Sequence, residues 1–166
     1  MNPNYLTYLF MGVAGSGKTT IAKKFSKKIN AFVIEGDDFH SSENINKMSS
    51  GIPLNDEDRY EWLVKIKDEI QSRQKTQNVV VACSALKKKY RLILEVDNYK
   101  LVYLKISKAT ARKRIRSRLN HFMPDSLIDS QFAILEEPIN GLTLNENLSP
   151  NEMIKELTSH FQKEIL

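Results

Sequence analysis

The residues best suited to chemistry lie near the N-terminus, in the stretch GVAGSGKT from Gly12 to Thr19. It matches the phosphate-loop pattern, in which glycines let backbone N–H groups point at phosphate oxygens. Lys18 stands where a lysine reaches the β- and γ-phosphates, and Thr19 stands where a hydroxyl binds Mg²⁺. The stretch predicts a nucleoside triphosphate site without choosing between a kinase, an ATPase and a GTPase. Its candidate nucleotide-binding residues are Gly12, Gly15, Ser16, Gly17, Lys18, Thr19 and Thr20.

A second polar group, EGDDFH, follows the next apolar run and contains Glu35, Asp37, Asp38 and His40. Ligands of open parallel sheets bind beyond the carboxyl ends of the strands, so we expect these side chains beside the phosphate loop. Carboxylates there can orient an acceptor hydroxyl, accept its proton or hold Mg²⁺ through water. The alternative interpretation is a solvated acidic turn in which Asp38 caps a helix.

Small residues follow the third apolar run, from Cys83 through Ser84 to Ala85. They allow a ligand to approach the backbone closely, which makes Ser84 a candidate binding residue. No acidic residue stands where ATPases hold magnesium after this strand, which favours a small-molecule kinase over a motor or a GTPase switch. We expect Cys83 to be a buried structural thiol rather than a nucleophile.

A strongly basic helix follows the fourth apolar run. Arg114 and Arg118 are four residues apart and are expected to share a face that His121 continues. Two guanidinium groups reaching over the transferring phosphates would supply a lid. Arg112 and Arg116 are expected to face solvent or the helix end. An RNA-contacting face is less favoured, because no aromatic residues for base stacking are interleaved.

Apolar runs alternate with helical patterns along the chain, which predicts a parallel sheet with helices on both faces. The predicted strands are 6–11, 31–34, 79–82, 101–106 and a short 142–144. The predicted helices are 19–29, 56–73, 86–95, 108–119 and 127–135, followed by a last helix that starts at Pro150. Ser149 and Glu152 form a capping box at that start.

Length and composition narrow the class of protein. A chain of 166 residues fits one domain, and 25 Lys and Arg against 20 Asp and Glu suit anionic ligands without singling out nucleic acid. One cysteine excludes an internal disulfide framework and indicates a reducing compartment. No apolar run reaches the ~18 residues that span a membrane. We expect a soluble, cytoplasmic protein without a leader segment or a membrane partner.

Several segments together resemble the gluconokinase (gluconate kinase) family, in the family's order and over nearly the whole chain. The most specific are GDDFH, KMSSGIPLNDEDR, CSALKKKYR and HFMPDSLIDSQFAILEEP. The loop ends in Thr19-Thr20 where Ser-Thr is more usual, and either hydroxyl can serve Mg²⁺. The matching stretches are residues 12–20, 35–63, 80–94 and 114–138.

The resemblance implies phosphoryl transfer from ATP to gluconate, giving 6-phosphogluconate and ADP, with Mg²⁺ as cofactor. It also implies a three-layer α/β P-loop kinase fold of the nucleoside monophosphate kinase type. Its five-stranded parallel sheet would have the order 2-3-1-4-5, in a single domain over 1–166 with a helical lid at about 112–137. A homodimer is a further implication, whereas a nucleic-acid partner is not expected.

Chemistry and resemblance together suggest roles for single residues. Asp37 is the candidate for orienting the gluconate 6-hydroxyl and taking its proton, and Arg59 could fork onto the carboxylate. The alternative for Arg59 is an ion pair with Asp56 or Asp58 at a helix start. The predicted catalytic residues are Lys18, Asp37 and Arg118; the nucleotide site adds Arg114 and Arg118; the substrate site comprises Asp37, His40, Arg59, Ser84 and Arg91.

Three further expectations concern His40, Trp62 and the tip of the lid. His40 either contacts a sugar hydroxyl or closes the turn after its strand. Trp62, at an amphipathic position, is expected in the core. Residues 121–124 are expected to form the tip of the lid.

Two other functional classes remain open from the sequence. The first is another small-molecule kinase, such as a shikimate or nucleotide kinase, with the same chemistry and a different acceptor. A shikimate-type site would show a glycine run after the third strand, where residues 83–86 read CSAL. The second is a nucleotide-binding regulator or RNA-associated protein that uses the basic helix.

Overall fold

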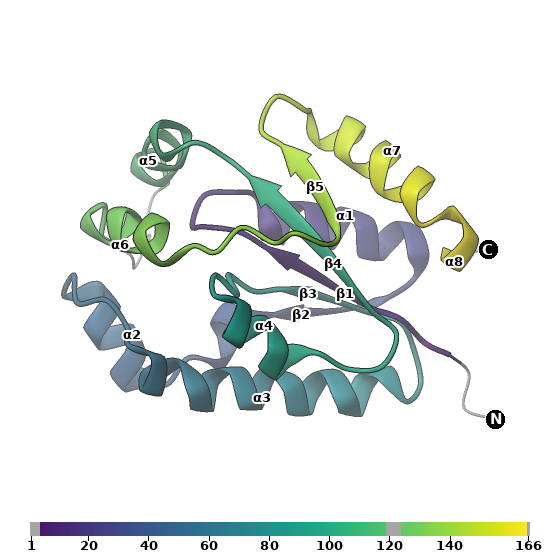
Figure 1. The fold of residues 1–166 in the computed structure, drawn as a ribbon, viewed down its shortest axis with the longest axis horizontal. Coiled ribbons are helices and arrows are strands. Elements are labelled where there is room, and N and C mark those ends of the chain that lie inside the picture. The colour runs from purple at the N-terminus through teal and green to yellow at the C-terminus, as the bar shows by residue number, and fades with distance from the viewer. Residues whose placement is uncertain (1–3, 119–123, 166) are drawn as a thin grey trace.

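A five-stranded parallel sheet organises the chain in the computed structural model, which describes residues 4–118 and 124–165. The strand order is β2-β3-β1-β4-β5, so the predicted fold class and sheet order are confirmed (Figure 1). All four strand pairings are parallel. The strands are β1 (Thr7–Met11), β2 (Phe32–Glu35), β3 (Val79–Ala82), β4 (Tyr99–Lys105) and β5 (Leu142–Asn145).

Helices connect the strands and cover both faces of the sheet (Figure 1). They are α1 (Lys18–Ile29), α2 (Ser42–Ser49), α3 (Asp56–Gln74), α4 (Lys88–Leu94), α5 (Lys108–Arg116), α6 (Ser126–Ile134), α7 (Pro150–His160) and α8 (Gln162–Ile165), with a 3₁₀ turn η1 (Gly36–Phe39). Among the described residues, no helix combines the length and the apolar character that a membrane span requires.

The core consists of two layers separated by the sheet, because successive side chains of β1 point to opposite faces. Tyr8 and Phe10 pack with Phe25 of α1 on one side, where α7 also contributes. Leu9 and Met11 pack against the apolar stripe of α3 on the other side. Burial on both faces explains why β1 and β3 are almost entirely apolar in the sequence.

Helices α5 and α6 form a separate pair that packs on the phosphate loop through Val13, Ile115 and Ile128. Arg112 pairs with Asp129 at 2.5 Å and Arg116 with Asp125 at 2.7 Å. The sequence predicts that these arginines face solvent or the helix end. They remain partly exposed, but their ion pairs join the two helices.

The structure departs from the predicted elements in two places that affect the site. Helix α5 ends at Arg116, so Arg118 follows the helix instead of sharing a face with Arg114; His121 lies outside the described residues. Helix α2 and the turn η1 were not predicted. Ser41 caps α2 by accepting the Asn44 N–H, so the suggestion that Asp38 is a helix cap is wrong.

Candidate active site

The phosphate loop links β1 to α1 and has the backbone that its glycines allow. Gly15 and Gly17 have φ angles of 81° and 93°, in the left-handed region that residues with a Cβ rarely adopt. The loop therefore turns sharply and places the N-terminus of α1, with its unpaired N–H groups, at its mouth. The Ser16 hydroxyl is buried without a partner among the described residues, as expected where an anion is to be bound.

Lys18 occupies the predicted position in this loop. Its Nζ donates a hydrogen bond to the carbonyl of Val13 at 3.0 Å. Burial lowers the pKa of the Lys18 ammonium, while the carboxylates of Asp37 and Glu35 act in the opposite direction. The Lys18 ammonium therefore lies close enough to the carboxylates of Asp37 and Glu35 for their charges to interact, so the lysine and the acidic turn belong to one site.

A cavity of about 430 Å³ opens between the phosphate loop, η1, α3 and α6. Its wall combines the carboxyl ends of β1, β2 and β3 with side chains from the helices, as expected for an open parallel sheet. Of the residues predicted from the sequence, it brings together Gly15, Gly17, Lys18, Thr19, Thr20, Asp37, His40, Arg59, Ser84 and Arg118.

Thr19 and Glu35 form the part of the cavity that fits a magnesium ion. The Thr19 hydroxyl donates to Glu35 Oε2 at 2.5 Å. Burial raises the pKa of Glu35, and the hydrogen bond from Thr19 partly offsets that effect. Both groups offer the oxygen ligands that Mg²⁺ prefers. No group of three or more His, Cys, Asp and Glu suited to a metal occurs among residues 4–118 and 124–165.

The turn that carries Asp37 is fixed by Trp62 of α3. The indole N–H of Trp62 donates to the carbonyl of Gly36 at 2.7 Å. His40 stacks on the indole with ring centroids 4.2 Å apart, and its Nε2 lies 3.9 Å from Asp37 Oδ1. Trp62 is buried as predicted and also lines the cavity. Asp37 itself is exposed to the cleft, whereas Asp38 is exposed and does not line it.

His40 is neutral near physiological pH. Burial lowers its pKa to about 4, and the charge of Arg59 acts in the same direction, although Asp37 opposes both. Its Nδ1 is buried without a partner in the described part of the chain. A neutral imidazole can both donate and accept, which suits contact with a hydroxyl group.

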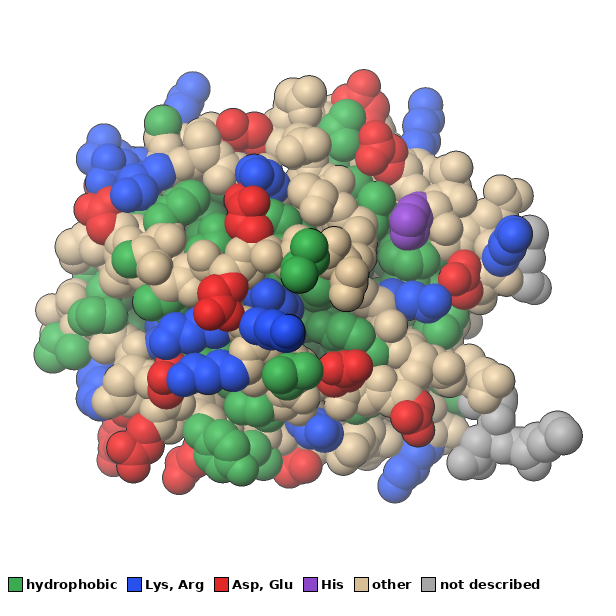
Figure 2. Space-filling model, in the orientation of Figure 1, with side chains coloured by type: hydrophobic (Ala, Val, Ile, Leu, Met, Phe, Trp, Pro, Cys, Tyr) green, Lys and Arg blue, Asp and Glu red, His purple; other side chains and the backbone are tan. Residues whose placement is uncertain are grey.

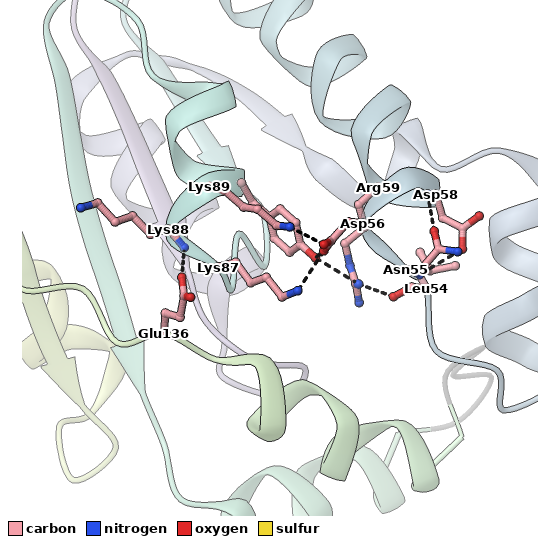
Figure 3. A network of polar contacts seen from close by, with 10 residues as sticks. Leu54, Asn55, Asp56, Asp58, Arg59, Lys87, Lys88, Lys89 and Glu136 are labelled. Carbon is pink, nitrogen blue, oxygen red and sulfur yellow. Dashed lines mark hydrogen bonds and ion pairs between the residues drawn. The ribbon is translucent and has the colours of Figure 1, made fainter.

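Arg59 lies in the cavity wall and does not form either of the ion pairs considered as its alternative role. Asp56 pairs with Lys87 and Lys89 (Figure 3). Asp58 pairs with Lys47 at 2.8 Å. The Arg59 guanidinium instead donates to the carbonyl of Leu54 and to the hydroxyl of Tyr90. These neutral partners leave the positive charge of Arg59 without a carboxylate partner among the described residues.

Arg91 differs from its prediction as a substrate-binding residue. It is 8% exposed, and its guanidinium donates to the carbonyls of Ala85, Leu86 and Glu136 at 2.9–3.1 Å. It therefore fastens the loop before α4 to the chain after α6 and does not line the cavity. The sequence placed Arg91 on the correct helix, but the orientation of that helix turns the side chain inward.

Arg114 touches the phosphate loop without lining the cavity. Its Nη1 donates to the carbonyl of Gly15 at 3.1 Å. Gly12 lies deeper, where its N–H donates to the carbonyl of Ser84 at 3.2 Å. The two residues therefore support the loop from either side.

Gln131 of α6 is a site residue that no sequence pattern predicts. Its Oε1 accepts the N–H of Ala14 at 2.7 Å, across 117 positions of the chain, and the residue lines the cavity. No local pattern distinguishes this glutamine from one on a solvated helix face. Cys83 behaves as expected, because it is buried and burial raises its pKa to about 12.

Comparisons with known proteins agree with this geometry. Residues 8–138 match a family described as AAA domain. The chain is 43% identical over 135 residues to the thermosensitive gluconokinase of Escherichia coli strain K12, covering 80% of this chain and 72% of that protein. It is 36% identical over 170 residues to the gluconokinase of Gluconobacter oxydans strain 621H, covering 99% and 94% of the two chains.

A solved structure agrees over almost the whole length. The crystal structure of a gluconokinase from Sinorhizobium meliloti 1021 superimposes with a TM-score of 0.84 at 34% identity, covering 98% of this chain and 94% of that one. Sequence identity is therefore above 30% over nearly complete chains for both the Gluconobacter protein and this structure. The chain belongs to the gluconokinase family of P-loop kinases.

Proposed function

We propose that this protein transfers the γ-phosphoryl group of ATP to the 6-hydroxyl of gluconate, giving 6-phosphogluconate and ADP. The observation that carries the proposal is the shared cavity of Lys18 and Asp37, in a chain of the gluconokinase family. Transfer of a phosphoryl group to a hydroxyl requires a loop that binds the phosphates and a carboxylate that orients the hydroxyl. Lys18 in the phosphate loop and Asp37 place both groups in this cavity.

Positioning and charge supply most of the catalysis, because phosphoryl transfer passes through a loose transition state. Lys18 and the N–H groups of the phosphate loop hold the β- and γ-phosphates, and Arg118 adds positive charge at the cavity wall. Asp37 orients the acceptor hydroxyl and takes its proton as the bond from the acceptor oxygen to the γ-phosphorus forms and the bond from that phosphorus to the bridging oxygen breaks, releasing ADP. Thr19, with Glu35 beside it, would hold Mg²⁺, which supplies charge neutralisation on the phosphates.

The carboxylate end of gluconate is assigned to Arg59. Its Nε and Nη2 have no hydrogen-bond partner among residues 4–118 and 124–165, so a fork of donors is available. A guanidinium binds a carboxylate bidentately, which fixes the orientation of the acid as well as its charge. His40 and Ser84 line the same cavity and are assigned to the hydroxyl groups between the two ends.

The segment 112–137 is proposed as the lid over the nucleotide. This proposal is supported by Arg118 and Gln131, which line the cavity, and by the contact of Arg114 with the phosphate loop. The expected lid tip lies at residues 121–124, and only Pro124 of these is among the described residues. We also propose that residues 1–166 form a single domain and that the protein is a cytoplasmic homodimer. Light scattering after gel filtration tests the dimer.

The RNA-associated alternative receives no support from the charges described. Two arginines of α5 are engaged by carboxylates, one by Asp129 of α6 and one by Asp125 just before α6. The face shown in Figure 2 interleaves Lys and Arg with Asp and Glu. Nucleic-acid surfaces need a continuous basic footprint.

An ADP-release assay with ATP, Mg²⁺ and one acceptor at a time tests the proposed reaction. Gluconate, shikimate and the nucleoside monophosphates are the acceptors to compare. We expect turnover with gluconate and rates at the no-acceptor background with the others. Turnover only with another acceptor would replace gluconate, and turnover with none would favour a binding module.

A further inference from the structure

We propose that Tyr90, fixed by Asp56, is a positioning residue that holds Arg59 ready for the carboxylate of the acceptor. The inference rests on the proposed function, in which Arg59 binds that carboxylate. Figure 3 shows Arg59 and Asp56 near the start of α3, facing Lys87 and Lys89 near the start of α4. Tyr90 lies on α4, so the orientation of Arg59 depends on a contact between two helices.

The guanidinium of Arg59 is held from two directions. Nη1 donates to the carbonyl of Leu54 and to the Tyr90 hydroxyl, the latter at 3.4 Å. The guanidinium carbon also lies 5.5 Å from the centre of the Tyr90 ring, within the range of a cation–π contact. An arginine side chain has much rotamer freedom to lose on binding, and these contacts remove part of it beforehand.

Tyr90 is itself immobilised. The residue is 2% exposed, and its hydroxyl donates to Asp56 Oδ1. Because the phenol proton is directed at the carboxylate, the lone pairs of the hydroxyl remain available to accept from Arg59. A Tyr90 ring without its hydroxyl would keep the packing and lose the hydrogen bond to Arg59.

Asp56 accepts hydrogen bonds from three donors other than Arg59. Lys87 lies 2.9 Å from Oδ1, and Lys89 and the Tyr90 hydroxyl also donate to the carboxylate. Hydrogen bonds from Lys89, Tyr90 and Lys87 hold the pKa of Asp56 well below its usual range. The lysines therefore keep Asp56 ionised and occupied, so Arg59 is not drawn into an ion pair with it.

The start of α3 is fixed independently of this network. Asn55 and Asp58 form a capping box, and Lys47 of α2 pairs with Asp58. The backbone of Asp56 and Arg59 is thus set by the cap, while Tyr90 sets only the side chain of Arg59. This separation lets the role of Tyr90 be tested without disturbing the helix.

The test is Tyr90→Phe, measured by steady-state kinetics with gluconate and with ATP. Loss of a hydrogen bond to a charged group predicts a KM for gluconate raised about 5- to 30-fold. We expect kcat and the KM for ATP to change less than about 2-fold, because Tyr90 does not line the cavity. The control is Tyr60→Phe on α3, which removes the hydroxyl of a tyrosine that is 58% exposed and should leave all three constants unchanged.

The same substitution in an Arg59→Lys background shows whether Tyr90 acts through Arg59. We expect Tyr90→Phe to change the KM for gluconate less than about 2-fold there, because the group that it positions is gone. An unchanged KM in the single variant, or the same fold-change in both backgrounds, would overturn the inference. If Tyr90→Phe lowers the thermal midpoint by more than a few degrees, Asp56→Asn provides the same comparison, with a raised KM for gluconate expected.

Failure of the inference is distinguishable from failure of the proposed function. If the unaltered protein does not phosphorylate gluconate, the proposed function fails before any variant is made. If it does, and Tyr90→Phe matches it in every constant, only the positioning role is lost.

Discussion

The hydroxyl of Thr19 donates a hydrogen bond to the carboxylate of Glu35, with the two oxygens 2.5 Å apart. This contact joins the phosphate loop after β1 to the end of β2, although β3 lies between those strands in the sheet. Because parallel strands end at the same edge, the acidic turn that follows Glu35 reaches the phosphate loop across the intervening strand. The contact therefore fixes the acceptor side of the cavity relative to the nucleotide side.

Substitutions at Thr19 should separate the role of its hydroxyl from that of its shape. Thr19→Ser keeps the oxygen, and we expect kcat within about 3-fold of the unaltered protein. Thr19→Val keeps the branched shape and removes the oxygen ligand, and we expect kcat to fall roughly 10²-fold, as for other lost transition-state contacts. Rates measured across a Mg²⁺ titration check both. Equal rates for the two variants would remove the hydroxyl from the metal site.

Asp37→Asn should lower kcat by roughly 10²- to 10⁴-fold, because the amide cannot accept the proton of the acceptor hydroxyl. The KM for ATP should change little. Asp38→Asn is the matched control, since Asp38 is the next residue, is exposed and does not line the cavity. A rate for Asp37→Asn close to that of the control would exclude Asp37 as the base.

Arg59→Lys should raise the KM for gluconate about 10- to 100-fold, because lysine keeps the charge but cannot form the fork. We expect kcat at saturating gluconate to stay within a few-fold. Arg73→Lys, near the other end of α3 and paired with Glu69, is the control. Isothermal titration with gluconate measures the affinity directly, and an unchanged affinity would contradict the bidentate contact.

His40 should make stability depend on pH between about 4 and 6.5. Burial lowers its pKa to about 4, whereas an unfolded histidine titrates near its ordinary value of 6.5. In that pH window the unfolded chain binds more protons than the folded one, so the free energy of unfolding rises with pH. The contribution of neutral His40 is complete above about pH 6.5 and is lost as the pH falls toward about 4.

Thermal midpoints of the unaltered protein and of His40→Gln, measured from pH 7.5 to 4, isolate this contribution. We expect the midpoint to fall more steeply with acid in the unaltered protein. His160→Gln, on the surface of α7, should follow the unaltered curve. Parallel curves for His40→Gln and the unaltered protein would show that His40 titrates alike in both states.

Much of the fold was predictable because its signals are local. The run Val79–Ala82 is continuously apolar and is a central strand with those bounds. The capping box of Ser149 and Glu152 forms as predicted at the start of α7. Helix α2 was missed because its eight residues carry only two buried side chains, Asn44 and Met48, too few to show a periodic stripe.

The phosphate loop, the α/β fold and the acidic turn follow from local sequence, because glycine positions, apolar period and residue order are properties of neighbouring residues. The packing of the helices, in contrast, is what turns Arg59 toward the cavity and Arg91 inward, and what brings Gln131 to Ala14 from a distant helix. Side-chain direction depends on how helices pack across the sheet. That packing is set by contacts between residues far apart in the chain, which no local pattern records.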